Sequence, residues 1–369
     1  MRILALEPYY GGSHRAVLDG LVARTCAEWT LLTLPARKWK WRMRGSAITM
    51  AEEIRRRSAA GEGWDVVFAS TFVNLAELYG LAGKALAGVP SIVYFHENQL
   101  VYPNRHTAEW DFQFPLTNIT SALAADLCVF NTGFTRRTFL DEITPFLKQF
   151  PDHHPEGVAE RIAAKSEVIA PPFDPAPFDS VLGSEGVAAA VRGQRPRIVW
   201  PHRWEHDKDP DTFFRAVTRL AAEGLDFEVA VAGQPFRETA EEVRAAADAL
   251  GDRLVHVGEP AGREVYAGLL AGSDIAVSTA DNEFFGLAMI EACYAGCAPV
   301  VPDRLAYVEL YPVECRYRDE NGLVALLRSH ITHRPAPGQG RALAEEYTFL
   351  RLVGEYERTF AEVAVRGRR

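Results

Sequence analysis

The sequence has few cysteines, and none of them are spaced to hold a metal. Five cysteines occur among 369 residues, with no Cys-x-x-Cys pair. An odd, sparse set of this kind excludes a disulfide framework and a zinc-ribbon signature. It is typical of a protein in a reducing compartment, so we expect a cytoplasmic protein.

Long hydrophobic runs and an excess of positive charge are also missing. No stretch of about eighteen apolar residues occurs, which argues against a membrane-spanning helix. The apolar run at Arg2–Leu6 is shorter than a signal peptide needs. Lys and Arg number 40 against 49 Asp and Glu, a formal net charge of -9. Nucleic acid would therefore have to be held by a local basic patch.

Short apolar runs alternate with helical patterns along the chain, which is typical of parallel sheets with crossover helices. The length of 369 residues suits two domains. The predicted strands form two series, Arg2–Leu6, Asp65–Ala69, Ser91–Phe95, Leu127–Phe130 and Glu167–Ala170, then Arg197–Trp200, Phe227–Ala232, Leu254–Val257, Ile275–Val277 and Ala298–Val301.

A proline-rich connector separates the two series. The prolines within Ala170–Pro177 exclude a continuous helix or an inner strand there. We therefore predict an α/β protein with two Rossmann-like, doubly wound domains, residues 1–172 and 173–349. Residues 350–369 are predicted to form a helix that packs back on the first domain. Ligands of such sheets bind at the carboxyl ends of strands, so candidate residues are sought there.

The first predicted strand is followed by a glycine pair and then a helical pattern. Gly11 and Gly12 would let the backbone approach a diphosphate or sugar near a helix N-terminus, with Ser13 and His14 next in the chain. A simple tight turn is the alternative.

The strand Ser91–Phe95 ends in four polar residues, His96, Glu97, Asn98 and Gln99. Histidine titrates close to neutral pH, which makes His96 a candidate for catalysis. The alternative is a hydrogen-bonded structural histidine.

Charged residues also follow the first strand of the second domain. Arg203 and Lys208 precede a helical pattern that starts near Asp211, and two cations beside a helix N-terminus suit a departing diphosphate. A solvated charged loop is the alternative. Asp207 and Asp209 resemble a metal-binding pair only superficially, because Lys208 between them would repel a divalent cation. Asp209 is predicted to cap the helix instead.

Two glutamates, Glu283 and Glu291, follow the strand Ile275–Val277. On one helix they would stand roughly 80° and about 12 Å apart, too far for a close carboxylate pair but suited to the two ends of an extended ligand. The backbone N–H groups of Phe285, Gly286 and Leu287 would meet phosphates between them. An amphipathic helix with one buried and one exposed glutamate is the alternative.

A basic run follows a second strand and precedes a helical stretch. It contains five cations and two indoles, namely Arg37, Lys38, Trp39, Lys40, Trp41, Arg42 and Arg44. Guanidinium groups pair with phosphates and indoles stack on exposed bases, so this predicted loop favours contact with looped RNA. An ordinary basic loop with its tryptophans anchored in the core is the alternative.

The order of these features resembles the retaining glycosyltransferases of family 4, which have the GT-B fold of two Rossmann-like domains facing across a cleft. Within that group the chain resembles the tRNA-queuosine mannosyltransferases. The matching segments are Glu7–His14, Leu34–Trp39, Tyr94–Leu100, Trp200–Pro210 and Glu283–Gly286. The family pattern often has His where Asn282 stands in this chain and Pro where Val308 stands. The first difference adjoins the sugar-binding glutamate, so the identity of the hexose or the nucleotide stays open.

The resemblance implies transfer of mannose from GDP-mannose to the cyclopentenediol of queuosine, at the wobble position of tRNA-Asp. It assigns acceptor binding to the first domain, including Ser13, His14, the basic run and Glu97, Asn98 and Gln99. It places Arg203 and Lys208 at the diphosphate, Glu283 at the transferred sugar and Glu291 at the donor ribose. His96 would lie by the reacting carbon or by the outer hydroxyls of the sugar, and Gly11 and Gly12 by the phosphates.

The donor base would be read after the strand Leu254–Val257, near Gly258. No carboxylate nucleophile is evident for double displacement. We therefore expect front-face attack, with the donor phosphate taking the acceptor's proton and with no cofactor and no metal. The alternatives are a related glycosyltransferase acting on a glycan, lipid or small metabolite, a nucleotide-sugar epimerase, and a non-catalytic protein that binds RNA or nucleotide sugars.

Overall fold

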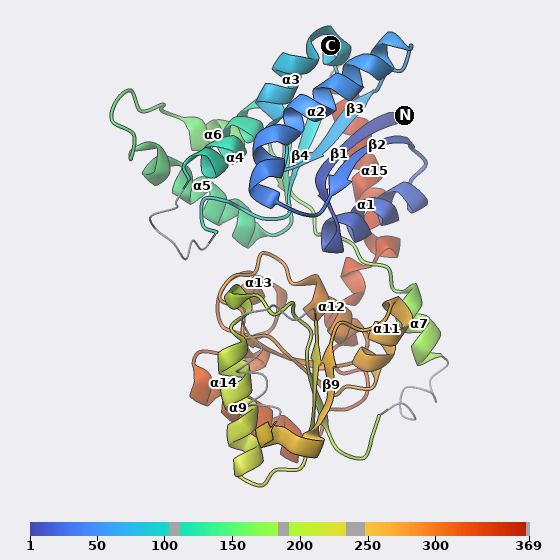
Figure 1. The fold of residues 1–369 in the computed structure, drawn as a ribbon, viewed down its shortest axis with the longest axis vertical. Helices are drawn as coiled ribbons and strands as arrows, with labels where there is room; N and C mark the ends of the chain where they lie inside the picture. Colours follow the sequence, from blue (N-terminus) through green and yellow to red (C-terminus); the bar gives the residue numbers. More distant parts are fainter. Residues whose placement is uncertain (103–110, 184–191, 234–247, 367–369) are drawn as a thin grey trace. The chain divides into compact units, whose positions relative to one another are not determined.

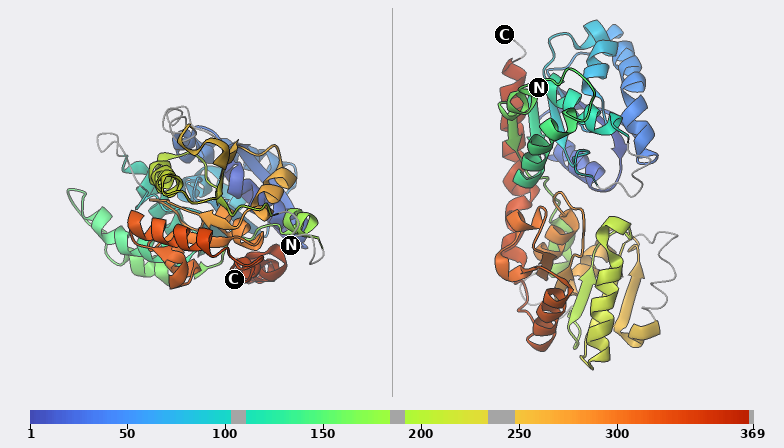
Figure 2. Two further views of the ribbon diagram at one scale, coloured as in Figure 1. Left: turned by 90° about the horizontal axis from the view of Figure 1, so that it is seen from below. Right: turned by 90° about the vertical axis from the view of Figure 1, so that its left-hand side faces the viewer.

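The computed structural model describes residues 1–102, 111–183, 192–233 and 248–366. The chain divides into two compact units, residues 1–172 with 352–369 and residues 173–351. Each unit contains a six-stranded sheet in which all pairs of neighbouring strands are parallel. Helices cover both faces of each sheet (Figures 1 and 2). In the part of the chain that is described, no helix is both long enough and apolar enough to span a bilayer.

The sheet of unit 1 has the strand order β2-β1-β3-β4-β5-β6. Its strands are β1 (Arg2–Tyr10), β2 (Glu28–Pro35), β3 (Val66–Ser70), β4 (Ser91–Phe95), β5 (Leu127–Phe130) and β6 (Ser166–Val168). Its helices are α1 (Gly12–Arg24), α2 (Trp39–Ala59), α3 (Leu75–Ala82), α4 (Gln113–Ala124), α5 (Gly133–Leu147), α6 (Val158–Ala163) and most of α15 (Phe349–Arg366), with a 3₁₀ turn η1 (Gly83–Leu86).

The last helix, α15, packs on unit 1 although it follows all of unit 2 in the sequence. The Tyr356 hydroxyl donates to the carbonyl oxygen of Ala170 at 3.1 Å. The ring of Phe360 meets that of Trp29 edge to face at 5.5 Å. Figure 2 shows the helix alongside the sheet of unit 1.

The sheet of unit 2 has the order β12-β11-β10-β7-β8-β9. Its strands are β7 (Arg197–Trp200), β8 (Glu228–Ala232), β9 (Leu254–Gly258), β10 (Ile275–Val277), β11 (Ala298–Pro302) and β12 (Arg316–Tyr317). Its helices are α7 (Ala176–Leu182), α9 (Pro210–Ala222), α11 (Arg263–Ala271), α12 (Leu287–Tyr294), α13 (Tyr307–Leu310) and α14 (Glu320–Thr332). The 3₁₀ turns are η3 (His206–Lys208), η4 (Gly251–Arg253), η5 (Val313–Cys315), η6 (Arg341–Leu343) and η7 (Glu345–Tyr347).

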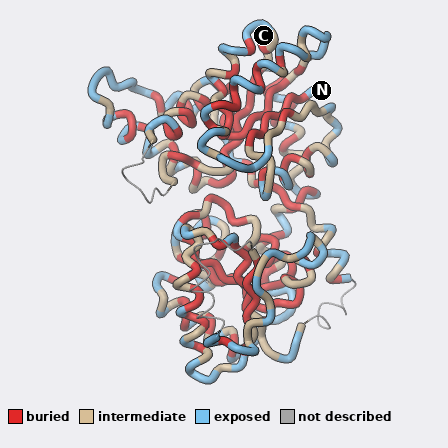
Figure 3. Tube along the Cα trace, in the orientation of Figure 1, coloured by how far each residue is buried: buried red, intermediate tan, exposed pale blue. Residues whose placement is uncertain are grey.

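The inner strands carry the core of each unit. Every residue of β3, β4, β5 and β11 is buried, as expected for parallel strands covered on both faces. In Figure 3, the red segments of the tube mark the buried residues, which gather at the sheet in the centre of each unit. All the predicted strands overlap observed ones, although β6 covers Ser166–Val168 rather than Glu167–Ala170 and β8 begins at Glu228. The strand before the basic run, β2, was expected without bounds. The two-residue edge strand β12 was not predicted, because it lacks an apolar run.

The first strand is longer than predicted. It was expected to end at Leu6 but continues to Tyr10, and its register against β2 shifts between Glu7 and Tyr10. Pro8 lies at this irregularity and has no N–H to give to a sheet ladder. Helix α1 begins only two residues beyond the strand, so the glycine pair forms a tight strand-to-helix turn.

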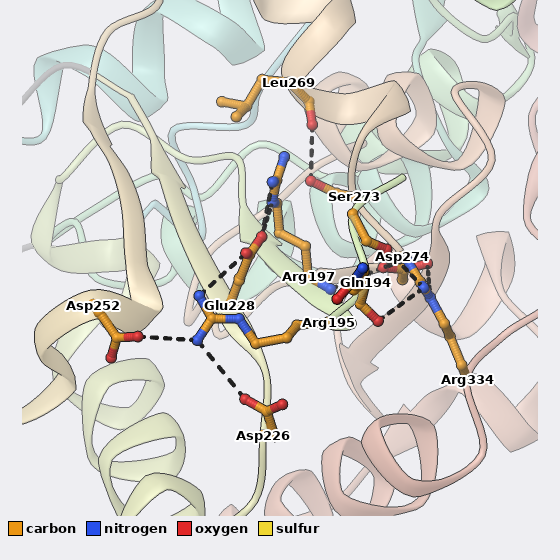
Figure 4. A network of polar contacts seen from close by, with 11 residues as sticks. Gln194, Arg195, Arg197, Asp226, Glu228, Asp252, Leu269, Ser273, Asp274 and Arg334 are labelled. Atoms are coloured by element: carbon orange, nitrogen blue, oxygen red, sulfur yellow. Dashed lines mark hydrogen bonds and ion pairs between the residues drawn. The ribbon is translucent and has the colours of Figure 1, made fainter. Parts of the chain in front are cut away.

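Ion pairs connect residues at the amino-terminal edge of the unit 2 sheet (Figure 4). Arg197 pairs with Glu228 at 2.8 Å. Asp274, just before β10, is fully buried and accepts the Arg197 backbone N–H at 2.8 Å. The same carboxylate pairs with Arg334 at 2.8 Å and with Arg192 at 3.1 Å. One buried carboxylate therefore joins β7, β10 and the segment after α14.

We expect the substitution Asp274→Asn to destabilise the protein by about 3–5 kcal/mol, because two guanidinium groups would lose a fully buried counter-charge. Chemical denaturation followed by circular dichroism measures the loss. Asp226→Asn is the matched control, since Asp226 is 76% exposed and 3.7 Å from Arg195. A loss for Asp274→Asn as small as that of the control would contradict the prediction.

Candidate functional site

Two loops at the carboxyl edge of the unit 2 sheet are joined by backbone hydrogen bonds. They follow the neighbouring strands β7 and β10. The carbonyl oxygen of Asp207 accepts the N–H groups of Asp281 at 2.8 Å and Asn282 at 3.2 Å. The Thr279 hydroxyl donates to the carbonyl oxygen of Lys208 at 2.7 Å. These bonds hold the predicted diphosphate-binding segment against the predicted sugar-binding segment.

Lys208 lies at the centre of this arrangement. Its ammonium donates to the carbonyl oxygen of Asn282 at 2.6 Å and pairs with Asp207 at 3.2 Å and Glu283 at 3.4 Å. Burial alone would lower the pKa of Lys208, but the Glu283 and Asp207 carboxylates outweigh it and raise that pKa. Lys208 therefore carries a positive charge directly beside Glu283.

Arg203 has a different environment from Lys208. Its side chain is 62% exposed and pairs with Glu205 at 3.0 Å. A surface pair of this kind is weak, so the guanidinium can exchange Glu205 for a phosphate. Directly after Lys208, Asp209 caps α9 as predicted, because its carboxylate accepts the Thr212 N–H at 3.2 Å.

The predicted geometry of Glu283 and Glu291 on one helix is wrong. Helix α12 starts only at Leu287, and Glu283 lies in the preceding loop. Gly286 caps the helix at φ 85°, in the left-handed region, and a Cβ there would lie 3.2 Å from the Tyr307 ring. The glycine ends the loop, so the spacing of the two glutamates does not follow a helical repeat.

The amides that were predicted to meet phosphates lie at this helix start. Glu283 accepts the N–H groups of Phe284 at 3.1 Å and Phe285 at 3.5 Å, which fixes its carboxylate beside the helix. The N–H groups of Gly286 and Leu287 follow in the first turn, where a helix offers donors without intrahelical acceptors. An anion at this position would meet both these donors and the helix dipole.

Glu291 is held by Arg263, a residue that the sequence patterns did not reveal. Two guanidinium nitrogens of Arg263 pair with the two carboxylate oxygens, one of them at 3.2 Å. Arg263 also lies over the rings of Phe178 at 5.1 Å and Tyr266 at 5.4 Å. The only sequence feature that could have indicated a role for Arg263 was its position directly after Gly262, at the first residue of α11.

A second feature missed from the sequence is the close approach of β8 to the loop after β7. A Cβ on Gly233 would lie 1.9 Å from the carbonyl oxygen of His202, so only glycine fits. Burial, aided by the charge of Lys208, lowers the pKa of His202 to about 3. Gly233 also donates its N–H to the carbonyl oxygen of Gly258 at 3.0 Å, which places the predicted base-reading position beside this loop.

In unit 1 the glycine pair forms the turn between β1 and α1. A Cβ on Gly11 would lie 2.5 Å from the Cβ of Ala36, and Gly12 has a left-handed φ of 52°. Gly11 is therefore required by the close approach of the Ala36 side chain, and Gly12 is favoured by its left-handed backbone conformation. Ser13 is exposed in the first turn of α1, and His14 next to it is buried.

His14 and His96 are brought together, and Glu7 joins them. The ring centroids of the two histidines are 4.0 Å apart. Nδ1 of His14 lies 3.0 Å from Oε2 of Glu7, whose side chain is 6% exposed. Burial lowers the pKa of His96 well below its usual range, and a charge on His14 would lower it further. Glu7 was not predicted, although it precedes His14 by only seven residues.

The polar residues after His96 are largely engaged in shaping their own loop. Asn98 is fully buried, and its side-chain oxygen accepts the Leu100 N–H at 2.9 Å. Gln99 donates its side-chain N–H to Glu97 at 2.8 Å and its backbone N–H to Asn118 at 3.0 Å. Glu97 is partly exposed, so it is the member of this group that a ligand can reach.

The basic run was predicted as a loop, but most of it is helical. Helix α2 begins at Trp39, and its buried residues Met43, Ala47, Met50 and Ile54 have helical spacing. The helical spacing of these buried residues accounts for the helix, although charged residues cluster at its start. Lys38 precedes the helix at a left-handed φ of 56°.

The two tryptophans of the run have opposite environments. Trp39 packs on Phe114 with ring centroids 5.0 Å apart, as the core-anchored alternative proposed. Trp41 is 64% exposed. Arg37, Lys38 and Lys40 are also exposed. Arg44 pairs with Asp111, and Arg42 donates to the carbonyl oxygen of Pro35 at 3.3 Å.

Potential metal ligands come together at one place among the described residues. The ligand atoms of Glu7, His14 and His96 lie within 4.8 Å of one another. Two imidazoles and a carboxylate are ligands that transition metals accept. The same groups also bind one another through the hydrogen bond between Glu7 and His14.

Comparison with known proteins shows which families and relatives this chain resembles in sequence. Residues 2–173 match the family described as tRNA-queuosine alpha-mannosyltransferase N-terminal, and residues 188–311 match glycosyl transferases group 1. A tRNA-queuosine alpha-mannosyltransferase from Drosophila melanogaster is 40% identical over 328 residues, covering 88% of this chain and 85% of the relative. A GDP-mannose-dependent alpha-(1-6)-phosphatidylinositol dimannoside mannosyltransferase from Mycobacterium tuberculosis is 25% identical, covering 97% of this chain and 81% of that relative.

Solved structures resemble the chain over nearly its full length. A sucrose-phosphate synthase from Thermosynechococcus elongatus has a TM-score of 0.71 at 13% identity, covering 99% of this chain and 100% of the other. The Anabaena protein HepE in complex with UDP and glucose has a TM-score of 0.65 at 14% identity, covering 98% and 100%. At these identities the likeness concerns the fold alone, and it confirms the predicted α/β class of the GT-B type.

We expect Arg203→Ala and Lys208→Met each to lower glycosyl-transfer turnover by roughly 10²–10³, the effect of removing one preorganised electrostatic donor. Steady-state kinetics at saturating donor measures the loss. Arg215→Ala is the matched control, because Arg215 forms an exposed pair with Glu320 on the same unit. Near-normal turnover in both site variants would show that these cations do not stabilise the leaving group.

Proposed function

This chain is a member of the tRNA-queuosine alpha-mannosyltransferase family, and we propose that it transfers mannose from GDP-mannose to queuosine in tRNA. The acceptor atom is a hydroxyl of the cyclopentenediol, at the wobble position of tRNA-Asp. The 40% identity with the Drosophila enzyme over most of both chains carries the proposal. A cytoplasmic location follows from the tRNA substrate.

The donor assignment draws on unit 2. Lys208 and the exposed Arg203 supply positive charge for a diphosphate. Glu283, fixed by Lys208 and by two backbone N–H groups, offers oxygens to the hydroxyls of a sugar. The mycobacterial relative named for its dependence on GDP-mannose supports the same donor.

The acceptor assignment draws on unit 1. Cations and an exposed indole at the start of α2 form a local basic patch on a protein of net charge -9. Such a patch suits the phosphates of an anticodon loop, and Trp41 suits stacking on an unpaired base. Ser13, His14, His96 and Glu97 would then meet the modified base.

For the reaction, we propose front-face transfer with retention of configuration. The bond from the sugar C1 to the donor phosphate oxygen breaks as the bond from C1 to the acceptor oxygen forms. The leaving phosphate takes the acceptor's proton, and Arg203 and Lys208 stabilise the charge that develops on the phosphate. This route uses no metal and no cofactor.

The first experiment incubates the protein with queuosine-containing tRNA and GDP-mannose in the presence of EDTA. Mass spectrometry of the digested nucleosides should show queuosine gaining one hexose. UDP-glucose and tRNA that lacks queuosine are the controls and should give no such product. Absence of a hexosylated nucleoside with every donor tested would refute the proposed acceptor.

We expect the triple substitution of Lys38, Lys40 and Arg42 by Ala to weaken tRNA binding and to flatten its salt dependence. The slope of log K against log salt should fall by about one unit for each lost phosphate contact. Fluorescence anisotropy with labelled tRNA measures that slope. Replacing Arg55 and Arg56 at the other end of α2 is the control. An unchanged slope in the triple variant would remove this patch from the RNA-binding surface.

A further inference from the structure

Glu7 has its two carboxylate oxygens engaged at the carboxyl edge of the unit 1 sheet. Oε1 accepts the backbone N–H of Tyr9 at 2.8 Å, and Oε2 lies 3.0 Å from Nδ1 of His14. A carboxylate can only accept hydrogen bonds, so the proton in this contact belongs to Nδ1 of His14. In the neutral ring, Nε2 is then the acceptor nitrogen.

The neighbouring His96 strengthens this arrangement. Two imidazoles whose centroids are 4.0 Å apart resist carrying charge together. Tyr94 packs edge to face on His96 at 4.6 Å, and Tyr9 packs on His14 at 6.3 Å. Each histidine therefore has an aromatic ring packed against it.

The same groups line a small cavity, together with a serine whose buried hydroxyl has no hydrogen-bond partner among the described residues. The cavity has a volume of about 10 Å³ and is lined by Glu7, His14, Ser70, Tyr94 and His96, among others. Ser70 ends β3, between β1 and β4, and is 5% exposed. Its hydroxyl has no hydrogen-bond partner within the described parts of the chain. The volume suits about one hydroxyl group or one water molecule.

We propose that Glu7 is a positioning residue for the acceptor, and that it holds His14 in the Nδ1–H tautomer so that Nε2 accepts a hydrogen bond from an acceptor hydroxyl. This inference rests on the proposed function, in which the acceptor carries a vicinal diol. This hydrogen bond from the acceptor hydroxyl to Nε2 involves no transfer of an atom or a proton. The bonds that form and break remain those of front-face transfer, and the proton still goes to the leaving phosphate.

Glu7→Gln tests the proposal with little change in shape. A carboxylate satisfies both donors, the Tyr9 N–H and the His14 Nδ1–H, whereas an amide has one oxygen and turns an NH₂ group toward one of them. We expect kcat/KM for queuosine tRNA to fall by about 10–100-fold, the usual cost of losing a group that orients a functional histidine. KM for GDP-mannose should stay within about twofold.

A spectroscopic measurement reads the tautomer without turnover. Long-range ¹H–¹⁵N spectra of the protein labelled in histidine should show His14 as Nδ1–H in the wild type. In Glu7→Gln this signature should shift toward Nε2–H. Asp19→Asn is the matched control, because Asp19 lies on the same helix and pairs with Arg15 at 3.1 Å. It should change neither the spectrum nor the kinetics.

Several outcomes would overturn the inference. One is an Nε2–H tautomer of His14 in the wild type, and another is an unchanged kcat/KM for tRNA in Glu7→Gln. A loss of donor and acceptor affinity together, with reduced thermal stability, would show a purely structural role. Activity that is lost with EDTA and restored by Zn²⁺ would assign Glu7, His14 and His96 as metal ligands instead.

The proposed function can fail separately from this inference. If the wild type transfers hexose to no queuosine tRNA, the proposed function falls and the acceptor role of His14 falls with it. The spectrum would still decide whether Glu7 fixes the His14 tautomer. Ser70→Ala provides a second variant, which should lower kcat/KM for tRNA while leaving that tautomer unchanged.

Discussion

All strands within each sheet run in one direction, and the positions of the polar site residues follow from that constraint. The carboxyl ends of parallel strands meet at one edge, so residues far apart in the sequence become neighbours. In unit 2 the adjacent strands β7 and β10 bring Lys208 to Glu283. In unit 1 the ends of β1, β3 and β4 bring together Glu7, Ser70 and His96.

The amino-terminal edge of the unit 2 sheet holds the strands that carry these loops. Asp274 is fully buried and joins two strands through Arg197, Arg192 and Arg334. A fully buried carboxylate tolerates little displacement of its partners, because leaving it unpaired would be costly. This pairing at the amino edge links β7 to β10, while the carboxyl edge carries the loops with the candidate site residues.

Much of this arrangement could be predicted from the sequence, because the inner strands are continuous apolar runs bounded by polar residues. The positions of Lys208, Glu283 and His96 after such strands were readable for the same reason. The start of α12 was not, since it depends on the left-handed conformation of Gly286 rather than on any periodicity. The contact between Glu291 and Arg263 was also hidden, because it joins separate helices.

Carboxylates in both units are each paired with a donor from the protein itself. Glu283 faces Lys208, Glu291 faces Arg263, and Glu7 faces His14. A carboxylate held in this way keeps its orientation, and part of the cost of removing it from water has been met during folding. In the proposed function, hydroxyl groups of the sugar and of the diol would add to this existing hydrogen-bond network. Because these carboxylate oxygens are already fixed, recognition would depend on their geometry more than on net charge.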